Sequence, residues 1–403
     1  MRRFLLLLLN LGLLLVSVDS VQAQSLVAVT GAHVDYMFGE QITFSAVITS
    51  PSPLQDSYLF FQAVGDQNTH VFPLTLAPDG ATEYVHHIQD GLVRPFSLVY
   101  YWYHVTLVSG DTFESTHYSF QYNDNRYPWQ TLKDEDLSVH WYAGDVTFGQ
   151  AAVDAAHVGL QSVETLIPVT SPEPIDIYIY TSSTDVQDTL SLGGYNWVAG
   201  VAIPDLDVVL VSVAPGESQA IEMARQIPHE LAHVLLYRFT GTAYNRLPAW
   251  LLEGIALQVE QYPGLDINQE LSSATRNKTL LPIADLCGSF PSGASDAMLA
   301  YAESDSFVGY LLATYGTSGL QALIQAYADG LSCDQGTARA LNLPLLQLDL
   351  NWQQTVLGAD ISGVAIRTLL PYLALLAAML IIPIWQLGIK KKKKEQLNGN
   401  KKG

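Results

Sequence analysis

The chain has 403 residues, of which 49% are hydrophobic and 14% are charged, and its formal net charge is −20. Soluble domains carry about 25% charged residues, so part of the apolar excess must lie outside such domains. Residues 24–367 hold 10 Lys and Arg against 37 Asp and Glu, a net charge of −27. A region this acidic repels phosphate backbones, which excludes nucleic acid as a partner.

The first residues have the pattern of a secretory signal peptide. Arg2 and Arg3 precede the apolar run Phe4–Val18, and Val21-Gln22-Ala23 supplies small residues for cleavage. We therefore expect residues 1–23 to be removed on export, and an uncleaved anchor helix is the alternative.

A β-rich region follows. Short runs of apolar and aromatic residues, such as Gln41–Ile48 and Ser97–Leu107, are separated by turn residues such as Pro78-Asp79-Gly80. Several strands at this spacing predict an all-β immunoglobulin-like sandwich over residues 25–122. The polar residues 123–137 predict a linker.

Residues 138–352 have a different pattern. Helical periodicity predicts a helix over Phe148–Leu166, and the chain beyond Ser218 is almost entirely helical in pattern. Strands are expected at Ile175–Tyr180, Trp197–Ile203 and Asp207–Val213. Strands first and helices afterwards indicate an α+β domain, in which a small β-sheet is followed by helices.

An apolar segment near the C-terminus predicts a membrane span. Thr368–Ile389 has no charged residue, and as a helix it would reach about 33 Å, enough to cross a hydrocarbon core of ~30 Å. Lys390–Lys394 follow at once, so residues 390–403 are expected to be a basic cytoplasmic tail. With a cleaved signal peptide, this predicts a single-pass type I protein of the cell membrane with an extracytoplasmic catalytic domain. A buried core helix is the alternative.

The exported part contains two cysteines, Cys287 and Cys333. Outside the cytosol an even pair is most simply one disulfide. Neither cysteine lies in a CxxC pattern, so a metal or redox role is not expected.

Residues 229–233 read HELAH, an HExxH motif inside a predicted helix, Ile221–Phe239. Positions i and i+4 share one face of a helix, so His229 and His233 can bind a single zinc ion, and Glu230 is placed to act as general base on water. HExxH also occurs by chance in surface helices. No histidine follows His233, so the third ligand is expected to be a carboxylate from a later helix, and Glu253, 20 positions on, is the natural choice.

HELAH followed by WLLEG resembles the gluzincin peptidases, particularly the aminopeptidase-N and thermolysin-like groups, and Val139–Leu350 resembles the bacterial peptidase MA-like domain. The resemblance implies a zincin-like catalytic domain with one zinc ion per chain, acting on a peptide or protein substrate. Leu252 stands where the usual WLNEG motif has Asn, which affects local hydrogen bonding rather than metal ligation. No GxMEN motif precedes HELAH, so an endopeptidase is expected rather than an aminopeptidase.

Three further positions are candidates around this site. Aminopeptidase-like enzymes stabilise the oxyanion with a tyrosine that opens a later helix, a pattern similar to the run from Tyr301; Tyr310 and Tyr315 are alternatives that fit core positions better. Glu260, seven positions after Glu253, is expected either to accept a histidine N–H or to be solvated. By resemblance, Gly193–Ile203 is expected to form the sheet edge that pairs with substrate.

The leading hypothesis is therefore a membrane-anchored extracytoplasmic zinc metallopeptidase that hydrolyses peptide bonds with Glu230 as general base. Two alternatives stay open. The chain could be a catalytically inactive peptidase-like protein with a role in adhesion or binding. It could also be a zinc hydrolase that acts on a different acyl group, because a zinc site activates water for any such target.

Overall fold

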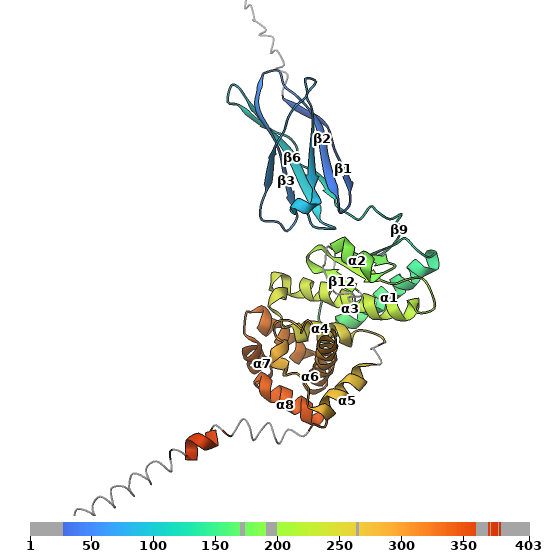
Figure 1. Ribbon diagram of the computed structural model, residues 1–403, viewed down its shortest axis with the longest axis vertical. Coiled ribbons are helices and arrows are strands. Elements are labelled where there is room, and N and C mark those ends of the chain that lie inside the picture. The colour runs from blue at the N-terminus through green and yellow to red at the C-terminus, as the bar shows by residue number, and fades with distance from the viewer. Residues whose placement is uncertain are drawn as a thin grey trace, which may run out of the picture. The chain divides into compact units, whose positions relative to one another are not determined.

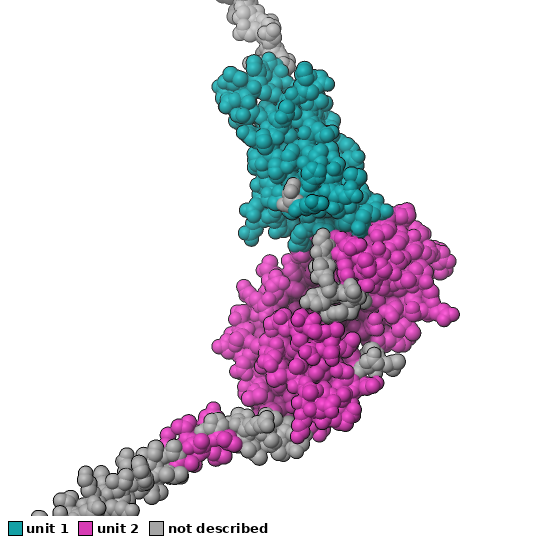
Figure 2. Space-filling model, viewed as in Figure 1, with its two compact units in different colours: residues 1–126 teal, residues 127–403 magenta. Residues whose placement is uncertain are grey.

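The computed structural model describes residues 27–169, 174–190, 200–262 and 266–359, together with residues 370, 372–377 and 379. The chain divides into two compact units, residues 1–126 and residues 127–403 (Figure 2). The predicted signal peptide and basic tail lie outside the described residues, as does most of the predicted membrane helix, residues 368–389. Within the described part of the chain, no helix is both long and apolar enough to span a bilayer.

The first unit contains two antiparallel sheets (Figure 1). One has the strand order β1-β2-β5, and the other has the order β4-β3-β6-β7, with β8 also pairing with β6. The elements are β1 (Ala28–Met37), β2 (Gln41–Thr49), β3 (Leu54–Ala63), β4 (His70–Pro73), β5 (Ala81–His87), the 3-10 turn η1 (Ile88–Asp90), β6 (Leu98–Leu107), β7 (Thr112–Glu114) and β8 (Tyr118–Gln121).

Alternation of apolar side chains explains why these strands form a sandwich. Ile42 and Phe44 on β2 are buried, and so are Phe61 on β3 and Tyr101 on β6. Successive side chains of a strand point to opposite faces, so each sheet presents one apolar face to a shared core. The expected β-sandwich is therefore present within residues 27–126.

The second unit begins with a five-stranded sheet of order β12-β13-β11-β10-β9. The three central strands run parallel to one another, and the two edge strands are antiparallel to their neighbours. The strands are β9 (Gln130–Asp134), β10 (Leu137–Trp141), β11 (Ile175–Tyr180), β12 (Gly200–Ile203) and β13 (Val208–Ser212).

The prediction of a linker over residues 123–137 is wrong in its second half. β9 lies inside that range and pairs with β10, with Thr131 opposite His140 and Lys133 opposite Ser138. Three of the five β9 residues are exposed, because β9 is an edge strand. An exposed edge strand carries the polar residues that are also typical of a linker, so the composition alone did not separate the two.

Helices make up most of the rest of the second unit, which confirms the mixed α+β architecture with sheets first and helices afterwards. The predicted helices at Phe148–Leu166 and Ile221–Phe239 are confirmed as α1 and α3, with ends that differ by a few residues, and the later helix expected to carry Glu253 is α4. The helical elements are α1 (Val146–Leu166), α2 (Ser183–Leu190), η2 (Pro204–Leu206), α3 (Gln219–Thr240), η3 (Gly241–Arg246), α4 (Ala249–Gln258), α5 (Asp266–Asn277), η4 (Ile283–Leu286), α6 (Ala294–Ala328), α7 (Cys333–Leu341) and α8 (Leu345–Thr355).

Helices α1 and α3 pack against each other and against the sheet (Figure 1). The Asp145 side chain caps α1 by accepting the backbone N–H groups of Thr147 at 3.0 Å and Phe148 at 3.2 Å. On α1, a Cβ at Gly159 would lie 2.9 Å from the Cα of Pro228. Glycine therefore allows α1 to approach α3 closely, one residue before the HELAH motif.

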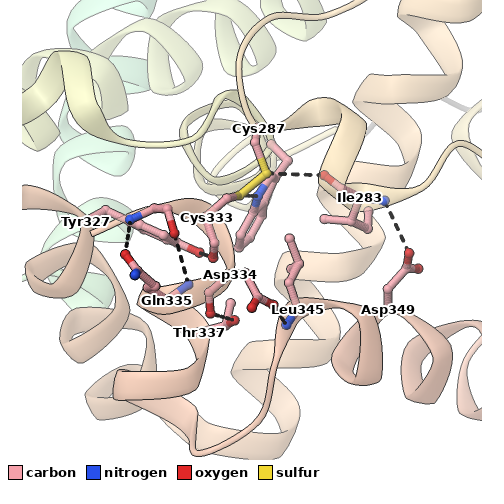
Figure 3. Close-up of a disulfide and its surroundings, with 11 residues drawn as sticks. Ile283, Cys287, Tyr327, Cys333, Asp334, Gln335, Thr337, Leu345 and Asp349 are labelled. Atoms are coloured by element: carbon pink, nitrogen blue, oxygen red, sulfur yellow. Dashed lines mark hydrogen bonds between the residues drawn. A yellow bond between two sulfur atoms is a disulfide. The ribbon is translucent and has the colours of Figure 1, made fainter. Parts of the chain in front are cut away.

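A disulfide joins Cys287, just after η4, to Cys333 at the start of α7 (Figure 3). Both cysteines contact the beginning of α4. The backbone N–H of Ala249 donates to the Cys287 carbonyl at 3.3 Å, and the buried indole of Trp250 donates to Cys333 Sγ at 3.4 Å. The disulfide thus lies against the first turn of the helix that carries Glu253.

Candidate metal centre

His229 and His233 lie one turn apart on α3, with ring centroids 5.2 Å apart. His233 is buried and His229 is partly buried. The third predicted ligand, Glu253, comes from α4, which packs against α3. Its Oε2 lies 3.4 Å from His229 Nε2 and 3.8 Å from His233 Nε2.

These three side chains form a group that could hold a metal ion, since their ligand atoms all lie within 4.8 Å of one another. Tetrahedral zinc with bonds of about 2.0–2.1 Å places neighbouring ligand atoms roughly 3.3 Å apart. The two measured separations, 3.4 Å and 3.8 Å, are close to that value. Two imidazole nitrogens and one carboxylate oxygen also match the ligand preference of zinc, so the residues present fit the ion.

Pro228, which precedes His229, helps to complete the site. Proline has no N–H, so the Ala224 carbonyl one turn earlier lacks its usual intrahelical donor. The backbone N–H of Gln261 takes that carbonyl instead, at 3.1 Å. This contact ties the segment after α4 to α3, and it brings Glu260 Oε1 within 2.8 Å of His229 Nδ1. Of the two expectations for Glu260, the structure shows contact with a histidine ring.

The other histidine has a partner that the sequence did not reveal. The Tyr244 hydroxyl, from η3 between α3 and α4, lies 3.0 Å from His233 Nδ1. Tyr244 belongs to no motif and lies outside the periodic helices, so neither spacing nor amphipathic pattern singles it out. The short 3-10 segment η3 alone brings it back over α3.

Glu230 is buried, and its side chain faces the edge strand β12. A Cβ at Gly200 would lie 2.7 Å from Glu230 Oε1. Burial raises the pKa of Glu230 to about 7, against the lowering effects of a charged His229 and of a hydrogen bond from the Ala202 backbone. Of the predicted substrate-pairing segment Gly193–Ile203, residues 193–199 lie outside the described residues, and the remainder forms β12.

Neighbouring charges pull the pKa values of the two histidines apart. Burial lowers the pKa of His229, but hydrogen bonds to Glu253 and Glu260 outweigh it, and the net shift is upward. Burial lowers the pKa of His233 to about 4, despite the nearby Glu253 carboxylate. Burial raises the pKa of Glu253, but the adjacent histidines reverse that effect and leave it below its usual value. His233 is therefore neutral at pH 7, the form in which an imidazole binds a metal, whereas His229 has to give up a proton when a metal binds.

Tyr301 lies in the second turn of α6, with its ring packed edge-on against Phe290 at 4.9 Å between centroids. Burial and the charges of Glu253 and Glu230 raise its pKa, so the hydroxyl keeps its proton. Tyr310 and Tyr315, the alternatives, pack against the hydrophobic core. The charges of Glu253 and Glu230 thus act on Tyr301, whereas Tyr310 and Tyr315 lie at the edge of the core.

Close packing of α4 and α6 supports this arrangement. A Cβ at Gly254, the residue after Glu253, would lie 2.6 Å from the Ser304 carbonyl and 2.5 Å from a methyl of Val308. Glycine therefore allows the two helices to touch at this point. Glu253 directly precedes the contact residue Gly254 on α4, and Tyr301 precedes the contact residue Ser304 on α6 by three positions.

Comparison with known proteins adds one informative match. Residues 155–358, about half of the chain, match the sequence profile of the Peptidase MA superfamily. No curated protein matches the chain in sequence.

Three of the solved structures that the chain matches have low sequence identities and low TM-scores. A structure described as a myokine is similar at 8% identity and a TM-score of 0.21, over 25% of this chain and 99% of that one. A cycloalternan-degrading enzyme from Trueperella pyogenes is similar at 12% identity and a TM-score of 0.18, over 27% and 16%. A polysaccharide deacetylase from Bacillus cereus is similar at 9% identity and a TM-score of 0.20, over 49% and 66%. TM-scores of this size do not establish a common fold.

Proposed function

The chain belongs to the Peptidase MA superfamily, and on this basis we propose that it is a metallopeptidase of the gluzincin type that uses one zinc ion per chain. The observation that carries the proposal is the convergence of His229, His233 and Glu253 within 4.8 Å. Three protein ligands leave a fourth position of a tetrahedral ion for water or substrate, as is typical of catalytic zinc.

The residues around the ligands have separate roles in this proposal. When bound, zinc supplies a Lewis acid that polarises the scissile carbonyl and makes water more acidic. Glu230 takes the proton of the attacking water and delivers it to the leaving amine. Burial raises the pKa of Glu230 above that of an ordinary carboxyl group, which favours uptake of this proton. Tyr301 donates a hydrogen bond from its hydroxyl to the oxyanion that forms at the carbonyl.

A peptide substrate suits the edge strand next to Glu230. Among the described strands β12 is the terminal one of its sheet, and Gly200 within it lies against the Glu230 carboxylate. An extended peptide can add to such an edge through main-chain hydrogen bonds, which places a peptide bond beside the catalytic carboxylate. No residue pattern for binding a free N-terminus precedes HELAH, so we propose endopeptidase activity.

We also propose that the protein acts outside the cytoplasm, held in the cell membrane by one helix over residues 368–389. The support comes from the sequence, in the signal-like residues 1–23, the uncharged 22-residue segment and the lysines that follow it. The β-sandwich of the first unit, which we take to be immunoglobulin-like, precedes the peptidase unit in this arrangement.

The direct test uses the full chain in detergent, a peptide library and three variants. Glu230→Gln should lower hydrolysis by roughly 10²–10⁴-fold while zinc stays bound, because the amide keeps the shape but cannot take a proton. Glu253→Gln should lose zinc, because it removes the anionic ligand. Glu217→Gln is the matched control, because Glu217 is exposed before the start of α3, and it should change neither property.

The alternatives predict other outcomes. An inactive adhesion protein would bind no zinc or would hydrolyse nothing even when loaded with zinc. A zinc hydrolase acting on another acyl group would bind zinc but would hydrolyse ester or other amide probes and not peptides. Glu230→Gln would abolish that activity. Normal turnover by zinc-loaded Glu230→Gln would refute the general-base role.

A further inference from the structure

Tyr244 has no role in the chemistry proposed above, yet it contacts a candidate ligand directly. Its hydroxyl lies 3.0 Å from His233 Nδ1, and the two rings meet nearly at right angles, with an interplanar angle of 85°. The Tyr244 ring also packs edge-to-face against the ring of Tyr237 on α3, with 5.9 Å between the two centroids. The Tyr244 side chain is therefore held in place, against the ring nitrogen of His233 that faces away from Glu253.

We propose that Tyr244 is a positioning residue of the metal site, which orients His233 by accepting the proton on its Nδ1. The inference rests on the proposed function, since it concerns the same site. A histidine that binds a metal through Nε2 must carry its proton on Nδ1, and an acceptor there fixes both the tautomer and the direction of the ring. The Tyr244 oxygen lies where that acceptor is needed.

The two histidines thus have partners of different charge. His229 Nδ1 faces the Glu260 carboxylate at 2.8 Å, whereas His233 Nδ1 faces a neutral phenol at 3.0 Å. Each carboxylate near a cation cancels part of its positive charge, while a phenol orients the ring without doing so. Tyr244 therefore orients His233 without adding a further negative charge beside Glu253, Glu260 and Glu230.

The test compares Tyr244→Phe with Tyr237→Phe in the purified full chain. Each variant loses one hydroxyl from a partly buried ring in the same aromatic contact, but only the Tyr244 hydroxyl meets a ligand. Zinc affinity is measured by competition with a chelator, and the circular dichroism of the metal-free proteins is compared first. Tyr244→Phe should bind zinc about 10–100-fold more weakly, as is usual when the partner of a ligating histidine is lost. Tyr237→Phe should bind zinc as the unmodified protein does.

Cobalt(II) provides a second readout that a general loss of packing does not produce. The visible spectrum of the cobalt-loaded protein should change in Tyr244→Phe, because the His233 ring is free to reorient, and should stay unchanged in Tyr237→Phe. Equal zinc affinity in both variants, or an equal loss in both, would overturn the assignment of Tyr244. Failure of the unmodified protein to bind zinc at all would instead refute the proposed function.

Discussion

Removal of the disulfide should destabilise the second unit by an amount that follows from its position in the chain. Cys287 and Cys333 are 46 residues apart. In the chain-entropy account, closing a loop of that length lowers the conformational entropy of the unfolded chain and so raises the free energy of unfolding by about 4 kcal/mol at 25 °C. For a unit of this size each 1 kcal/mol corresponds to about 2–4 °C in Tm, so the double substitution Cys287→Ser with Cys333→Ser should lower Tm by about 8–16 °C.

The assay is thermal unfolding followed by calorimetry, with and without a reducing agent. The unmodified protein in reductant should match the double variant, and the double variant should not respond to reductant, which separates loss of the disulfide from an effect of the serines. The first unit has no cysteine, so its transition is an internal control. A decrease below about 2 °C for the second unit would show that the cross-link does not constrain the unfolded chain as argued.

Two further predictions concern α6. Burial raises the pKa of Glu303 to about 8 from the ordinary 4.5, so the native state keeps a proton that the unfolded chain releases. The free energy of unfolding should therefore fall as pH rises from about 4.5 to about 8, and Glu303→Gln should flatten that decline in urea titrations at several pH values. Tyr301→Phe should keep zinc and lower kcat by about 10²–10³-fold in steady-state kinetics, because one oxyanion donor is removed; an unchanged kcat would assign that role to another group.

Local patterns were enough to predict the main parts of the candidate site. The four-residue spacing of His229 and His233 places both rings on one helix face, and the absence of later histidines left a carboxylate such as Glu253 as the third ligand. Glu260 was predicted from its spacing on a longer helix, seven positions after Glu253, but the structure ends α4 at Gln258 and places Glu260 just beyond the helix. The pairing of the two histidines depends on helix geometry, which short-range periodicity specifies.

Other features depend on contacts that periodicity does not specify. Tyr244 reaches His233 through a 3-10 segment. Pro228 has no N–H for the Ala224 carbonyl, and the backbone N–H of Gln261 donates to that carbonyl instead. The edge strand β9 was predicted as a linker because its side chains are mostly solvated. In these cases the deciding partner lies 11 or more positions away in sequence or is the solvent, and neither kind of partner leaves a repeating pattern in the sequence.

The most direct measurement is the zinc content of the purified full chain by elemental analysis, compared with His229→Ala. The account predicts close to one zinc ion per chain in the unmodified protein and almost none in the variant, since His229 is one of only three protein ligands proposed. A zinc-free unmodified protein, or a variant that retains the full amount, would contradict the assignment of His229, His233 and Glu253 as a metal site.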